Sequence, residues 1–163
     1  MLGQMQDWPL LVSKFLEHAE VNHPRREIVG LLPEGGKFEY TYADCAVRAK
    51  KCAQALGRLG VEMGDRVATL AWNSHRHMEI WYGASGMGAV THTVNPRLFP
   101  EQLIYIMNHA EDKVLMLDIT FVPLIEAIQD HLKTIEHYVI MVGREHMPET
   151  KLPNVLSYEE LLD

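Results

Sequence analysis

With 163 residues, the chain is long enough to bury the core of one domain and too short for two. Its 47% hydrophobic and 23% charged residues are typical of a soluble, globular protein. The formal net charge of −7, without any run of lysine and arginine, argues against nucleic acid and anionic membrane surfaces as partners, because both attract clustered positive charge.

The opening sequence MLGQMQDWPLLVSKFLEHAE lacks the cationic start, apolar stretch and small-residue cleavage site of a secretory signal. The sequence also contains no apolar run as long as a membrane span. Cys45 and Cys52 would lie two turns apart on one helix, too far to bridge each other. We therefore expect a reduced, cytoplasmic protein without a membrane span.

Residues 1–40 are expected to form a lead helix and a β-hairpin. An amphipathic helix is predicted after Pro9, because four apolar residues recur at helical spacing. These residues are Leu10, Leu11, Phe15 and Leu16. Two apolar runs then flank Pro33-Glu34-Gly35-Gly36, which is typical of a hairpin because glycine adopts the positive φ of a tight turn.

Residues 41–163 are expected to form a β-α-β subdomain of the α/β class. Thr41 with Asp44 resembles a helix N-cap, and the apolar stripe that follows ends at Gly60. Four aliphatic runs then alternate with helical stretches, which predicts about four strands in one parallel sheet flanked by helices. The runs are centred on Ala68, Thr91, Leu115 and Ile140. The helical stretch 75–87 is apolar on most sides, so we expect it to be deeply buried or covered by a partner.

Three sequence patterns resemble ligand or metal sites but have simpler structural explanations. The glycines of GASGMG (83–88) end a helix and precede a strand, which is the reverse of a phosphate-binding loop, so close helix packing is favoured. His75 and His77 would face apart on a helix and could not share one metal ion. Asp118 stands where a dinucleotide fold places its ribose-binding acid, but a turn and helix start at Thr120 are simpler.

Trp72 and Asn73 follow the first strand of the repeat, and Asn95 and Arg97 follow the second. The carboxyl ends of parallel strands form the edge that carries ligands in such sheets. These four residues are therefore the candidates for lining a substrate cleft. For Arg97, a surface salt bridge or a hydrogen bond to loop carbonyls is the favoured alternative, because the sequence shows no anionic partner.

The order of these pieces resembles the N-terminal part of the fatty-acyl-CoA synthetases, members of the adenylate-forming, AMP-binding superfamily. The segments GDRVATLAWNS, GAV…NPRL and SYEELL fall in the family's order. The likeness runs from about Thr41 to the end of the sequence. It implies a ligase of medium- or long-chain fatty acids that first forms an acyl-adenylate and pyrophosphate from ATP, after which the thiol of CoA displaces AMP.

The resemblance implies that the phosphate site lies elsewhere. In the family, Mg²⁺ and a Ser/Thr/Gly-rich loop ending in Pro-Lys-Gly hold the phosphates. This sequence contains neither Thr-Gly nor Lys-Gly, so we expect that loop to follow Asp163. No residue here matches a catalytic, cofactor-binding or metal-binding position. Fatty acid, ATP and CoA are implied partners of the full-length enzyme, as are the missing C-terminal part of the chain and a second copy in a homodimer.

The final sequence LSYEELLD supports this interpretation. Ser157 and Glu160 have capping-box spacing, yet only three residues follow, and so short a helix is not stable alone. We therefore expect the chain to stop at the start of an element. A free-standing flavodoxin-like binding or dimerisation module is the main alternative, and a short regulatory paralogue is a second.

Overall fold

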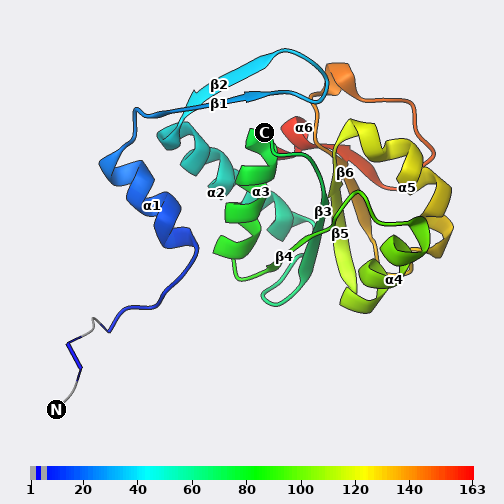
Figure 1. The fold of residues 1–163 in the computed structure, drawn as a ribbon, viewed down its shortest axis with the longest axis horizontal. Helices are drawn as coiled ribbons and strands as arrows, with labels where there is room; N and C mark the ends of the chain where they lie inside the picture. The colour runs from blue at the N-terminus through cyan, green and yellow to red at the C-terminus, as the bar shows by residue number, and fades with distance from the viewer. Residues whose placement is uncertain (1–2, 5–6) are drawn as a thin grey trace.

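The computed structural model describes residues 3–4 and 7–163, which form a sheet between two layers of helices (Figure 1). The sheet is parallel and five-stranded, in the order β4-β3-β5-β6-β7. Its strands are β3 (Arg66–Leu70), β4 (Val90–Thr93), β5 (Asp112–Leu117), β6 (His137–Ile140) and β7 (Val155–Ser157). The α/β class and the parallel arrangement of the four predicted runs are confirmed. The three-residue strand β7 was missed because it is too short to show a pattern.

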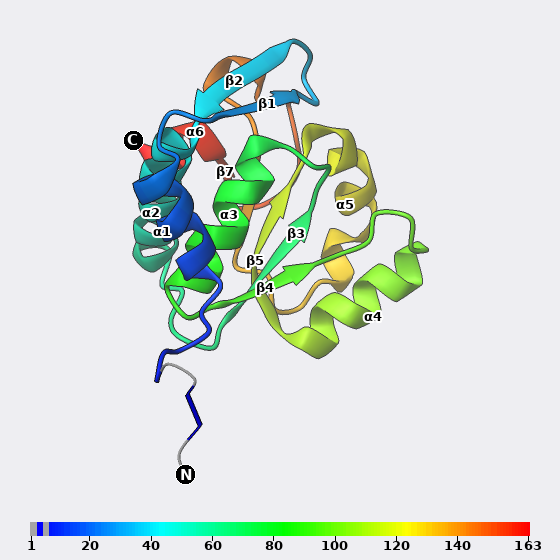
Figure 2. The same ribbon diagram turned by 60° about the vertical axis from the view of Figure 1, so that its left-hand side comes forward.

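Both faces of the sheet are covered by helices, as the two views in Figures 1 and 2 show. One face packs against α2 (Tyr42–Arg58), α3 (His75–Gly86) and α6 (Tyr158–Leu162). The other packs against α4 (Pro100–Ala110) and α5 (Val122–Ile128). Three short 3-10 segments complete this part of the fold: η1 (Ile119–Phe121), η2 (Gln129–His131) and η3 (Arg144–His146). None of the helices in the described residues is both long and apolar enough to cross a lipid bilayer.

The lead segment packs beside α2 and α3. It consists of α1 (Ser13–Asn22) and an antiparallel hairpin of β1 (Glu27–Leu31) and β2 (Lys37–Thr41), as predicted in kind. The predicted apolar stripe of the first helix was wrong. Leu16 is buried against α2 and the hairpin, whereas Leu10, Leu11 and Phe15 are exposed, because the helix begins only at Ser13 and contacts the body through one side.

Helix α2 begins as the sequence predicts. Asp44 N–H donates to Thr41 Oγ1 at 3.3 Å, and Thr41 N–H donates to Asp44 Oδ2 at 3.0 Å, so each residue satisfies a free donor of the first turn. Cys45 and Cys52 are both buried on this helix as free thiols. Burial raises the pKa of Cys45 to about 11 and that of Cys52 to about 12, so both are unreactive at neutral pH.

Helix α6 begins at the predicted place but without the predicted cap. The Ser157 hydroxyl donates to the Val142 carbonyl at 2.8 Å instead of capping the helix, and Glu160 pairs with Arg144. The capping-box prediction was therefore wrong. This five-residue helix is held by tertiary packing, since Tyr158 and Leu162 are buried against the sheet.

Gly83 allows α3 to pack closely on α2, which confirms the structural interpretation of the glycine-rich stretch. A Cβ at this position would lie 2.8 Å from the Ala49 carbonyl oxygen and 3.1 Å from Cys52 Cβ. Both separations are shorter than normal contacts, and the first involves backbone. Elsewhere α3 is not buried on all sides within this chain, because Trp81 is 38% exposed, and cover by a partner stays a prediction.

Gly83→Ala is expected to lower the free energy of unfolding by up to about 2 kcal/mol. Overpacking costs about 1–3 kcal/mol, and the better helix propensity of alanine offsets about 1 kcal/mol of it. Gly86→Ala is the matched control, because its Cβ would meet only Ser13 Cβ at an ordinary 3.9 Å. Urea unfolding of both variants checks the expectation, and equal stabilities would contradict it.

Candidate functional site

The boundary between β3 and β5 is the topological switch point of the sheet. The chain goes from β3 to β4 on one side and then crosses to β5 on the other. In sheets with this strand order, ligands bind outside the carboxyl ends of the strands at that boundary. Trp72, Asn73 and Ser74 follow β3 there, and Asp118 follows β5. The candidate site is therefore built around these two chain segments.

Trp72 is fixed to the β5 side of the switch point. Its N–H donates to Asp118 Oδ2 at 2.5 Å, and its indole Nε1 donates to Thr120 Oγ1 at 3.0 Å. The ring tilts against Phe121 with 5.1 Å between centroids. The indole thus lies over the segment that links β5 to α5, with 45% of the residue still exposed.

Asp118 is a further candidate residue at the switch point, directly after β5. Its side chain makes no N-cap bond to the segment that follows, is 1% exposed and leaves Oδ1 without a hydrogen-bond partner in the described part of the chain. Burial raises its pKa to about 6; the nearby charge of Glu34 acts in the same direction, and Arg76 opposes it. The sequence feature that indicates this position is an acidic residue directly after a buried strand.

Asn73 lines a groove of about 520 Å³ between β1 and α3. The groove is bounded on the hairpin side by Ile28, Val29 and Gly30, and on the sheet side by Thr93. The α3 side carries aromatic and polar side chains: His75, His77, Trp81 and Tyr82. Of the four residues predicted to line a cleft, this groove contains Asn73.

Asn95 and Arg97 form a local turn after β4. The Arg97 N–H donates to Asn95 Oδ1 at 3.0 Å, which fixes the loop before Pro100. Both side chains are exposed, and the Arg97 guanidinium makes no ion pair or hydrogen bond with any described residue. The favoured structural role of Arg97 is therefore not seen, and the cleft role of both residues stays a prediction.

Arg76 is the central cation of a buried cluster at this edge of the sheet. Its guanidinium is 2.6 Å from Glu34 Oε1 in the hairpin turn and 2.7 Å from Glu159 Oε1 in α6, and it donates to the Met141 carbonyl at 2.8 Å. Burial opposes ionisation of Glu159, but the hydrogen bonds and charges of Arg76 and Arg48 outweigh it and lower its pKa. One arginine thus joins the hairpin, the residue that follows β6, and α6.

Arg48 on α2 extends this cluster into the helical layer. It donates to Glu79 at 2.8 Å and to Glu159 at 2.9 Å, and the Tyr158 hydroxyl donates to Glu79 at 2.9 Å. Glu79 is fully buried, and burial raises its pKa although Arg48 and Tyr158 oppose the shift. The cluster holds α2, α3 and α6 together by charge-assisted hydrogen bonds.

His75 is a buried, neutral ring. It stacks on Phe38 of the hairpin with 3.5 Å between centroids. Burial, then the charges of Arg76 and Arg48, lower its pKa to about 3. Residues 3–4 and 7–163 contain no group of three or more histidine, cysteine or acidic side chains placed to hold a metal ion.

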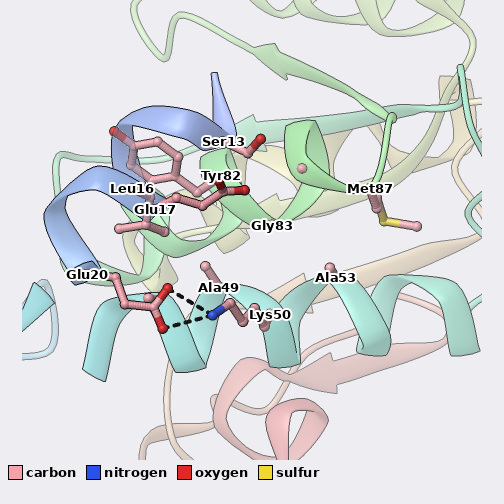
Figure 3. A pocket seen from close by; sticks show the side chains of 12 residues that line it. Ser13, Leu16, Glu17, Glu20, Ala49, Lys50, Ala53, Tyr82, Gly83 and Met87 are labelled. Carbon is pink, nitrogen blue, oxygen red and sulfur yellow. Dashed lines mark hydrogen bonds and ion pairs between the residues drawn. The ribbon is translucent and has the colours of Figure 1, made fainter. Parts of the chain in front are cut away.

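A smaller cavity of about 220 Å³ lies between α1, α2 and α3 (Figure 3). Its walls include small residues such as Ala49, Ala53 and Gly83, and Lys50 bridges to Glu20 at one side at 2.8 and 2.9 Å. The cavity lies in the helical layer formed by α1, α2 and α3, and Tyr82 lines both this cavity and the larger groove. Its geometry is that of a gap left by small residues at a helix junction.

Comparison with known proteins gives the family. A family model described as "AMP-binding enzyme" matches residues 15–160. The chain therefore belongs to the AMP-binding enzyme family. It is 46% identical to the 3-methylmercaptopropionyl-CoA ligase of Ruegeria lacuscaerulensis over 100% of this chain and 30% of that protein. It is 47% identical to the long-chain-fatty-acid–CoA ligase of Thermus thermophilus over 97% of this chain and 28% of that protein.

The fold also matches the solved structure of a CoA ligase. The anthranilate CoA ligase AuaEII, solved with anthranoyl-AMP, superposes with a TM-score of 0.77 at 25% identity, over 97% of this chain and 29% of that chain. The chain thus spans about 30% of the length of the relatives that it matches. The resemblance found in the sequence is confirmed.

Proposed function

We propose that this chain is the N-terminal part of an ATP-dependent fatty acid–CoA ligase, which forms an acyl-adenylate and then an acyl-CoA. The observation that carries the proposal is identity of 46–47% to CoA ligases across almost the whole chain. ATP, Mg²⁺, CoA and a medium- or long-chain fatty acid are the substrates and cofactors that this function requires. A cytoplasmic location and a division at residues 40/41 are parts of the same proposal.

In this proposal the switch-point edge supports the acyl and adenylate cleft. Trp72 and Asn73 lie at the switch point itself, and Asn95 and Arg97 form the turn after the neighbouring strand. The arrangement supplies positioned polar groups, but one exposed arginine is its only uncommitted cation among the residues just named. The reading frame beyond codon 163 tests the proposal, because a Ser/Thr/Gly-rich loop ending in Pro-Lys-Gly is expected within the next few dozen codons.

The 163-residue chain alone is expected to make no acyl-CoA and to bind ATP poorly. Adenylation depends on a preorganised site for the triphosphate, and an exposed ion pair contributes about 0–1 kcal/mol, whereas micromolar affinity requires about 8 kcal/mol. Pyrophosphate release with ATP, Mg²⁺ and a panel of fatty acids, beside calorimetric ATP titration, checks this. Turnover above background or micromolar affinity would contradict it.

The chain is also expected to self-associate. Trp8, Leu10, Leu11 and Phe15 are each more than half exposed at the N-terminal end, and exposed apolar patches attract partners. Light scattering across a concentration series measures this, with a Leu10→Ser/Phe15→Ser variant as the control that should shift toward monomer. A monomer at high concentration would show the expectation to be wrong.

A free-standing flavodoxin-like module is the second candidate, favoured by one observation. Strand β3 lies between β4 and β5, which gives the 2-1-3-4-5 order of that class. Such a module would bind or dimerise without catalysis. Absence of any ligase sequence in the downstream reading frame would favour it over the ligase.

A further inference from the structure

The base of the β1–β2 hairpin is tied to the start of α2. Tyr42 N–H donates to the Arg26 carbonyl at 3.0 Å, and Ala43 N–H donates to the Pro24 carbonyl at 3.2 Å. Tyr40, at the end of β2, is buried in the cluster formed with α1 and α2. The two ends of the hairpin therefore leave the body at one fixed point.

The tip of the hairpin is held by a different contact. Glu34 lies in the turn, beside Gly35 and Gly36 with φ values of +103° and +91°, and its carboxylate pairs with Arg76 at 2.6 Å. Both side chains are nearly excluded from solvent, at 4% exposed for Glu34 and 7% for Arg76. The tip is thus attached to α3 through one buried ion pair.

Between base and tip, the hairpin spans the groove of about 520 Å³ described above, with Phe38 stacked on His75 beside it. Figures 1 and 2 show the hairpin lying across the end of the parallel sheet, over α3. Strand β1 is partly open to solvent, because Val29, which borders the groove, is 53% exposed and Leu31 is 78% exposed. A two-stranded hairpin is marginally stable by itself, so these few contacts decide where it lies.

We propose that the β1–β2 hairpin is a hinged flap over the carboxyl edge of the sheet, with its hinge at Pro24–Arg26 and Tyr42 and its latch at Glu34–Arg76. Opening the latch leaves Arg76 compensated, since it keeps Glu159 and the Met141 carbonyl. It also returns the Glu34 carboxylate to water. Neither charge is then left buried and unpaired, so the open state avoids the main penalty of breaking a buried ion pair.

The function of the flap is to control access to the groove that contains Asn73. This inference goes beyond the proposed ligase function and does not depend on it. Closed, β1 forms one wall of the groove; open, that wall is removed and the α3 side, already partly exposed at Trp81, becomes more accessible.

Hydrogen exchange of the 163-residue chain tests the latch. Glu34→Gln is expected to accelerate exchange in peptides covering 27–41 at least fivefold, while peptides from β5 and β6 keep their wild-type rates. Glu39→Gln is the matched control, because Glu39 lies on the same hairpin but pairs with exposed Lys37. Wild-type rates in the Glu34→Gln hairpin, or equal acceleration of the sheet, would overturn the proposal.

Thiol labelling supplies a second measurement. Met78 lines the groove, and the two native cysteines are buried. In a Met78→Cys background, a thiol reagent should label the new cysteine at least fivefold faster with Glu34→Gln than with Glu39→Gln. Equal labelling rates would show that the hairpin does not gate the groove and would overturn the proposal.

Discussion

Replacing Arg48 with methionine is expected to lower the free energy of unfolding by about 3–5 kcal/mol, because it leaves the Glu79 carboxylate buried without its cation. Glu79 is 0% exposed and accepts a hydrogen bond from Arg48 at 2.8 Å. The substitution also removes the hydrogen bond that Arg48 donates to Glu159. Methionine keeps much of the apolar stem of arginine, so the loss reports charge rather than packing. Urea unfolding at pH 7.5 measures the effect.

The loss of unfolding free energy in the Arg48→Met variant should become smaller as the pH falls. Burial already raises the Glu79 pKa, and removal of Arg48 raises it further. A carboxyl group whose folded pKa is raised contributes stability that is present below its unfolded pKa and is lost as the pH rises through the folded pKa. The Arg48→Met variant should therefore approach the wild type near pH 4.

Two further variants distinguish the effect of the unpaired charge from a general loss of packing. Glu79→Gln in the Arg48→Met background should recover a large part of the loss, because it removes the unpaired charge and keeps the shape. Lys50→Met, on the same helix, should cost under about 1 kcal/mol, since the Lys50 pair with Glu20 is exposed. A small loss in Arg48→Met that does not depend on pH would contradict the expectation.

The local parts of the fold could be predicted from the sequence. The Thr41–Asp44 cap and the four longer strands depend on residues near each other in the chain, so spacing alone indicates them. Ser157 shows the limit of this reasoning. Its spacing to Glu160 is that of a capping box, but its hydroxyl donates to the carbonyl of Val142, in the segment after β6, instead of capping the helix. Tertiary contacts decided the outcome.

The candidate site was predicted only in part, for the same reason. Strand-end geometry predicted that Trp72 and Asn73 lie at the carboxyl edge of the sheet, because parallel strands share that edge, whereas their role in a cleft stays a prediction. The charge cluster was missed. Arg48 and Glu159 are 111 residues apart, and nothing in the local pattern around either residue marks the partner. The turn and helix start predicted after Asp118 are present as η1 and α5, but the contact of its side chain with Trp72 is not marked by any local pattern.

Asp118→Asn is expected to stabilise the chain at pH 7.5 by about 2–3 kcal/mol, an effect opposite in sign to most substitutions of buried polar residues. The Asp118 pKa, raised to about 6 by burial, lies about two units above the value of an unfolded aspartate, and each unit corresponds to about 1.4 kcal/mol. The buried carboxylate therefore costs stability once it is ionised. Asparagine has the same shape, and its Oδ1 can accept the Trp72 N–H.

The pH dependence distinguishes this effect from a change in packing. Because the folded pKa of Asp118 is raised, the contribution of this group to the stability of the wild type is fully present below about pH 4. That contribution is lost as the pH rises through 6. Asp118→Asn should match the wild type at pH 4 and exceed it progressively up to pH 7.5 in urea unfolding. Asp44→Asn is the control of opposite sign, because hydrogen bonds from Thr41 lower the pKa of Asp44, so that its loss should destabilise at pH 7.5 and matter less in acid. If Asp118→Asn were less stable at every pH by a constant amount, the charge of Asp118 would have no cost, and its role would be that of a hydrogen-bond acceptor for Trp72.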